Sequence, residues 1–243
     1  MFTETTEVPQ WLLSSWLRSC HAAGATANEA ELIATCRDLI DRWNQEDRCY
    51  HGVKHLVDVL SHVDELASEA QEPDLVRLAA WYHGAVFSSD TLKAYANEAG
   101  EDEVASGALA RNQLTALGIP TENAERVSRL ITTLVRHKAA GAGSDCAVLC
   151  DADLAVLKSD PQRYKQYIAA IREEYSHIPV VDFVKARLRI VSRLLDRSQL
   201  FTTAGAQGWE EAARQNLIAE RARLNKELKK LDEASQQVVH SAS

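Results

Sequence analysis

Residues 32–43 read LIATCRDLIDRW, and this stretch shows the pattern that decides the fold. Its apolar side chains recur at spacings of three and four, which places them on one face of a helix: Leu32, Cys36, Leu39, Ile40 and Trp43. The same period is found along nearly the whole chain, and we find no run of strictly alternating apolar and polar residues. We therefore predict an all-α protein, a single-domain helical bundle without strands.

Further apolar stripes divide the chain into its expected helices. Glycine and proline are sparse, with 10 and 5 residues, which favours helices over turn-rich β structure. The main bundle is expected over residues 9–203, followed by an amphipathic helix within 204–231 and a polar tail at 232–243. The stripes in the bundle lie at residues 11–17, 53–66, 75–86, 104–117, 121–134, 146–157, 164–175 and 183–195.

The composition limits the classes of partner. The chain has 243 residues, 35 of them acidic and 27 basic, and its net charge of -8 argues against a nonspecific nucleic-acid binder; we expect no binding to a nucleic-acid duplex. A small phosphorylated substrate is still compatible, because one bound cation reverses the local field. There are five cysteines without a CxxC pair, no basic leader and no apolar run long enough to span a bilayer. We expect a cytoplasmic protein that needs no membrane; a homo-oligomer remains open.

Three polar residues interrupt helices that otherwise face the core: His55, His83 and Asp151. An unpaired buried carboxylate is costly, so something must neutralise Asp151. A divalent metal would do so, and a neighbouring arginine would do so equally well. Each residue alone also fits a hydrogen-bonded core histidine, an ion pair or a helix cap. The combination of all three is what points to a metal site.

Several motifs together resemble one branch of the HD superfamily of metal-dependent phosphohydrolases. The resemblance covers roughly residues 9–203 and implies an all-α fold of the HD-domain type. It also implies one divalent metal ion, held by a histidine, a His-Asp doublet and a distant aspartate. The motifs are RCYHGVKH at 48–55, WYHGAVF at 81–87, LCDADL at 149–154 and REEYSHIP at 172–179.

The resemblance assigns roles to individual residues. The metal ligands that it implies are His55, His83 and Asp151. The residues that we expect to support catalysis are His51, Arg48 and Asp153. Arg48 would clamp a phosphate, because a guanidinium matches phosphate geometry, although a surface arginine before a helix fits as well.

Gly84 departs from the family pattern, because the aspartate of the doublet falls on this glycine. Two histidines and one carboxylate can still hold a divalent cation, but the loss of an anionic ligand should weaken binding. Asp90, Asp153, His51 or a water could complete the coordination. If Gly84 marks a lost ligand, Gly84→Asp is predicted to restore it and to tighten metal binding.

Three functions are compatible with these residues. The first is a metal-dependent phosphohydrolase that acts on a small phosphate ester or a nucleotide, impaired to some degree by Gly84. The second is a degenerate family member that binds a nucleotide or a protein partner without turnover. The third is a helical scaffold that uses residues 209–231 to bind a partner. Metal content and a turnover assay distinguish the three.

Overall fold

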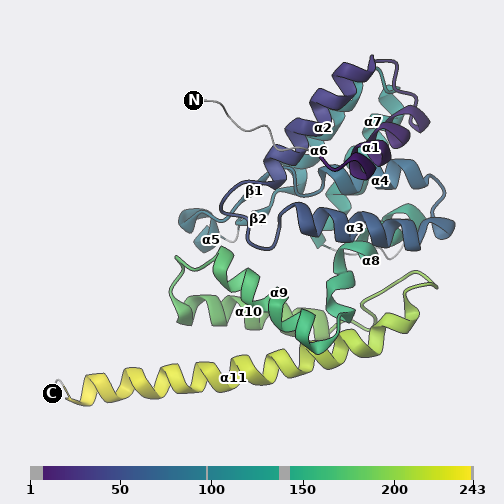
Figure 1. The fold of residues 1–243 in the computed structure, drawn as a ribbon. Coiled ribbons are helices and arrows are strands. Elements are labelled where there is room, and N and C mark those ends of the chain that lie inside the picture. The colour runs from purple at the N-terminus through teal and green to yellow at the C-terminus, as the bar shows by residue number, and fades with distance from the viewer. Residues whose placement is uncertain (1–7, 97, 137–142, 242–243) are drawn as a thin grey trace, which may run out of the picture.

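The computed structural model describes residues 8–96, 98–136 and 143–241, and it has an all-α architecture (Figure 1). The predicted fold class is confirmed. Short 3-10 turns at 67–69, 134–136, 155–158 and 207–209 connect some of the helices. The longer helices are α1 (Gln10–Ala22), α2 (Glu29–Trp43), α3 (Val53–Glu65), α4 (Pro73–Tyr82), α6 (Glu103–Ala116), α7 (Thr121–Thr133), α8 (Ser144–Leu154), α9 (Pro161–Glu174), α10 (Val180–Leu195) and α11 (Glu210–Ser241).

Helices α3, α4 and α8 pack against one another in the centre of the bundle, with α1 and α7 against α4. Three fully buried tryptophans hold this region together: Trp16, Trp43 and Trp81. The rings of Trp16 and Trp81 meet edge to face at 5.3 Å between centroids. Nε1 of Trp43 donates to the carbonyl of Trp81 at 3.0 Å, so the end of α2 is fixed against the end of α4. Both positions become important at the candidate site.

A short hairpin was not predicted from the sequence. Strands β1 (Phe87–Ser88) and β2 (Gly100–Glu101) pair antiparallel, with Phe87 opposite Glu101, and the short helix α5 (Thr91–Ala96) lies between them. Gly100 has φ +109°, a value that L side chains rarely adopt. The expectation of a chain without strands is therefore corrected, and the hairpin turns Glu101 toward the centre of the bundle.

Helix α11 continues to Ser241, beyond the predicted end at residue 231. Its first half packs on α10 and its C-terminal part extends past the body of the molecule (Figure 1, yellow). A buried group anchors it: Glu220 accepts from Arg187 at 2.7 Å and from the Tyr164 hydroxyl at 2.6 Å.

In the described part of the chain, no helix is long and apolar enough to cross a membrane.

Candidate metal centre

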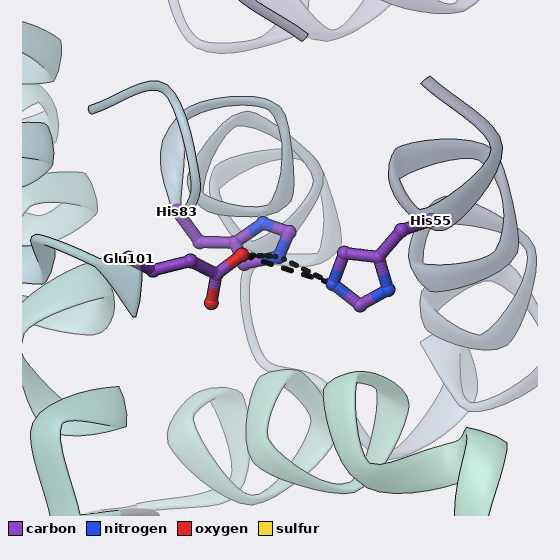
Figure 2. A group of neighbouring side chains, drawn as sticks. All are labelled: His55, His83 and Glu101. Atoms are coloured by element: carbon purple, nitrogen blue, oxygen red, sulfur yellow. Dashed lines mark hydrogen bonds and ion pairs between the residues drawn. The ribbon is translucent and has the colours of Figure 1, made fainter. Parts of the chain in front are cut away.

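Two histidines from different helices meet in the core. His55 lies on α3 and His83 directly follows α4, and their Nε2 atoms are 3.2 Å apart (Figure 2). The side chain of His55 is 4% exposed and that of His83 is 0% exposed. Nδ1 of His83 lies 2.6 Å from the carbonyl oxygen of Ala80, which can only accept, so Nδ1 carries the proton. In the neutral ring, Nε2 of His83 therefore offers its lone pair to the cluster.

Glu101 joins the two histidines from strand β2. Its Oε1 lies 3.5 Å from Nε2 of His83 and 3.8 Å from Nε2 of His55 (Figure 2). This oxygen is buried, and it has no hydrogen-bond partner within the described residues. A carboxylate oxygen in such a place is costly unless a positive charge balances it. The three residues form a group that could hold a metal ion.

Asp153 on α8 completes the group. Its Oδ1 lies 3.3 Å from Nε2 of His55 and 3.7 Å from Nε2 of His83. The five separations that involve Nε2 of His55 or Nε2 of His83 thus run from 3.2 to 3.8 Å. A tetrahedral site with bonds of about 2.0–2.2 Å has edges of about 3.3–3.6 Å. Each of the two carboxylates thus lies at a distance from both imidazoles that suits a divalent cation of the size of zinc.

Asp151 lies elsewhere, and the sequence-based assignment of the two aspartates is corrected here. Its carboxylate accepts from the backbone N–H groups of Thr202 and Thr203, and from the Thr203 hydroxyl at 2.7 Å. Two residues along a helix turn the side chain to nearly the opposite face, so only Asp153 can point at α3 and α4. Burial raises the pKa of Asp151, and the hydrogen bonds from Thr203 and Thr202 oppose that rise only in part. Asp151 therefore holds the chain that follows α10.

The space beside Gly84 is filled. A Cβ atom at this position would lie 2.4 Å from Cη2 of Trp43 and 2.5 Å from Oε1 of Glu101. Glu101 thus brings a carboxylate to the place where the HD resemblance expects the aspartate of the doublet. The expectation that Gly84→Asp tightens metal binding is therefore withdrawn. Asp90 does not substitute either, because its Oδ1 accepts from two N–H groups at the start of α5.

Arg48 is a positioning residue. It is 8% exposed, and its Nη1 donates to the carbonyl of Gly84 at 2.6 Å and to that of His51 at 3.3 Å. Its guanidinium also lies over the rings of Trp43 and Phe87. Burial lowers the pKa of Arg48 to about 10. Because backbone carbonyls hold its donors, Arg48 ties the segment before α3 to the segment after α4, and the phosphate-clamp role is not supported.

His51 lies beside the cluster and is held by Glu174, a residue that the sequence did not single out. Nδ1 of His51 is 2.6 Å from Oε1 of Glu174, and Oε2 accepts from the backbone N–H groups of Tyr50 and His51. Burial alone lowers the pKa of His51, but the hydrogen bond to Glu174 and the nearby carboxylates raise it above its ordinary value. Conversely, burial raises the pKa of Glu174, but the hydrogen bond from His51 lowers it overall.

A groove of about 1100 Å³ opens at the cluster. His51, His55, Glu101 and Asp153 line it together with residues of α5, α9 and α10. The cluster is thus accessible to a ligand that lies in the groove.

Comparison with models of known protein families finds no match. Comparisons with curated proteins and with solved structures find no match either. The resemblance to the HD superfamily therefore rests on the motifs alone, and the function has to be argued from the geometry of the site.

Proposed function

We propose that this protein is a metal-dependent phosphohydrolase that acts on a phosphate ester or a nucleotide. The observation that carries the proposal is the pair of histidines in the groove, whose Nε2 atoms lie 3.2 Å apart and within 3.8 Å of carboxylate oxygens of both Glu101 and Asp153. Two carboxylates and two imidazoles so close together are stable only if positive charge is shared among them. The arrangement supports the resemblance to the HD superfamily, with Glu101 in the place of the missing aspartate.

The residues that would hold one divalent cation are His55, His83, Glu101 and Asp153. A bound cation of this kind supplies two effects, because it lowers the pKa of a water and offsets charge on phosphoryl oxygens. The chain itself supplies the proton for the leaving oxygen. Glu174 occupies Nδ1 of His51, so Nε2 is the atom that is free to exchange a proton with a ligand in the groove.

A fold that binds a ligand without turnover is the alternative. Gly84 was the reason to consider it, because a doublet without its aspartate loses an anionic ligand. Glu101 provides a carboxylate at that place, which removes this reason. The two functions now differ only in whether phosphate is released.

Metal analysis combined with a phosphate-release assay tests the proposal. The protein is stripped with a chelator, reloaded with zinc or manganese, desalted and analysed for metal. Reloaded protein is then assayed with nucleotides and sugar phosphates. We expect one ion per chain, and at least about tenfold weaker binding in Glu101→Gln and Asp153→Asn. Asp182→Asn is the matched control, since Asp182 lines the same groove but accepts from the Tyr95 hydroxyl, and this variant should bind metal normally.

Each result decides between the alternatives. Equal metal binding by all three variants would contradict the proposed centre. A full complement of metal without phosphate release from any substrate of the panel would favour binding without turnover.

A further inference from the structure

A row of cations follows the groove along α10. Lys185, Arg189 and Arg193 are spaced four residues apart, which corresponds to steps of about 6 Å along the helix axis. All three are exposed, and all three line the groove that His55 and Asp153 also line. Within the described ranges, none of the three forms an ion pair.

Another cation on the same helix is buried and forms an ion pair. Arg187 is 7% exposed, and its Nε donates to Glu220 at 2.7 Å, so its charge is balanced inside the protein. The chain as a whole is acidic, with a net charge of -8. A row of cations without carboxylate partners in such a chain is a local reversal of charge, and it lies where a ligand would approach the cluster.

Aromatic and apolar groups accompany the cations. Tyr95 on α5 is 56% exposed, and its hydroxyl donates to Asp182 at 2.7 Å, which fixes the ring beside the start of α10. Tyr175 and Phe183 also line the groove, and Ile190 is 47% exposed. A ligand for this groove therefore combines a row of negative charges with flat, apolar parts. Grooves that bind single-stranded nucleic acids have this combination, because their aromatic side chains stack on bases while cations follow the backbone.

We propose that the groove binds a single-stranded oligonucleotide, with successive phosphates along Lys185, Arg189 and Arg193. A duplex fits poorly, because its paired bases are stacked on one another and do not reach protein rings. The groove volume of about 1100 Å³ exceeds the usual range of about 300–1000 Å³ for small-molecule sites only slightly, so the row of cations, and not the volume, is the argument for a strand. The inference rests on the proposed function, since it makes a phosphodiester of the strand the substrate of the metal centre.

The reaction balances with water as the only co-reactant. The oxygen of a water forms a bond to phosphorus, and the bond between phosphorus and one sugar oxygen breaks. The attacking water gives up one proton, and the sugar oxygen takes up one proton, for which Nε2 of His51 is placed, so no proton is gained or lost overall. The products are one strand that ends in a phosphate monoester and one that ends in a hydroxyl group.

Fluorescence anisotropy of the full chain tests the binding step. The probe is a fluorescein-labelled oligothymidylate of about ten nucleotides, within the usual site sizes of about 4–16. The groove variant carries Lys185→Gln, Arg189→Gln and Arg193→Gln. The control variant removes the same charge from exposed positions outside the groove, by Arg37→Gln, Arg111→Gln and Lys165→Gln.

For a single strand, each phosphate contact contributes about -0.7 to the slope of log K against log salt. The loss of three contacts should therefore make this slope less negative by about 2. We expect at least about tenfold weaker binding by the groove variant at 0.1 M salt, and no comparable change in the control. Equal losses in the two variants, or no binding by the unmodified protein at low salt, would overturn the proposal.

Two further probes identify the ligand class. An abasic strand of the same length should bind more weakly, because it cannot stack on Tyr95 or Tyr175. Equal affinity for the abasic strand, or equal displacement by polyglutamate, would show that any polyanion or acidic protein suffices and would overturn the proposal. Metal content is measured in parallel. Metal bound normally without strand binding refutes only this inference, whereas strand binding by a chain that takes up no metal supports the groove and refutes the phosphohydrolase.

Discussion

Replacing Gly84 with alanine would put a methyl carbon into a space that Trp43 and Glu101 already fill. The new carbon would lie 2.4 Å from Cη2 of Trp43 and 2.5 Å from Oε1 of Glu101, whereas atoms in contact lie about 3.5–4.0 Å apart. Gly84 is not among the glycines with positive φ, so alanine brings no backbone strain. Trp43 is fully buried and hydrogen-bonded to Trp81, so the overlap with its ring is costly to relieve, whereas Glu101, on its short strand, can move away.

The expected cost follows from this overlap. Extra carbon in a packed core costs about 1–3 kcal/mol. In a chain of this length, each kcal/mol lowers Tm by about 2–4 °C, so we expect a fall of about 2–12 °C. Displacement of Glu101 removes one anionic ligand, which should weaken metal binding by at least about tenfold. Gly84→Asp should behave in the same way or worse, because it adds a larger group to the same space.

Differential scanning calorimetry in chelator and isothermal titration with zinc or manganese measure the two effects. Gly208→Ala is the matched control, since a Cβ atom there meets nothing within 4 Å, and its stability should change by less than about 0.5 kcal/mol. If Gly84→Ala were as stable as the unmodified protein and bound metal as tightly, Glu101 would not be a ligand and the close packing beside Gly84 would be wrong.

Two further predictions concern buried carboxylates. Asp151→Asn should lower the stability of the metal-free protein by about 1–3 kcal/mol, because an amide cannot accept from all of the N–H groups at Thr202 and Thr203. Asp153→Asn should leave Tm in chelator nearly unchanged and abolish tight metal binding. The opposite pattern in calorimetry and titration would restore Asp151 as the metal ligand. The pKa of Glu174 is lowered, so this group stabilises the fold at pH values above its ordinary pKa, and that stability is lost as the pH falls. The pKa of His51 is raised, so this group stabilises the fold at pH values below its ordinary pKa, and that stability is lost as the pH rises. The stability difference between the metal-free protein and Glu174→Gln should therefore be largest at about pH 4.3–6.5, as measured by urea unfolding, and a difference that does not vary with pH would contradict this.

The sequence predicted the long helices because each repeats its apolar face over several turns. The stripe that ends at Trp43 became α2, and the stripes around His55 and Asp151 became α3 and α8. The hairpin could not be predicted in the same way, since two residues per strand are too few to establish an alternating pattern. Glu101 lies on that hairpin, so the residue that completes the centre was missed.

The roles of the two aspartates in LCDADL also could not be predicted from the sequence. Asp151 and Asp153 are both largely buried, and the apolar period of α8 does not indicate which of them faces α3. That choice depends on the Thr202–Thr203 segment, which is distant in sequence and takes the hydrogen bonds of Asp151. Likewise, nothing near Arg48 in the sequence indicates that the carbonyl of Gly84 would accept its donor.

The contact of Trp43 with Gly84 also restricts how this protein can evolve. An aspartate at position 84, as in the doublet of the HD pattern, requires a smaller side chain at position 43. The smaller side chain alone would leave a cavity where a fully buried indole now packs, and the aspartate alone would overlap with that indole. Each single substitution is expected to lower stability, so positions 43 and 84 are expected to change together. Related chains should therefore carry either glycine with a large aromatic residue or aspartate with a small residue, and rarely a mixture of the two.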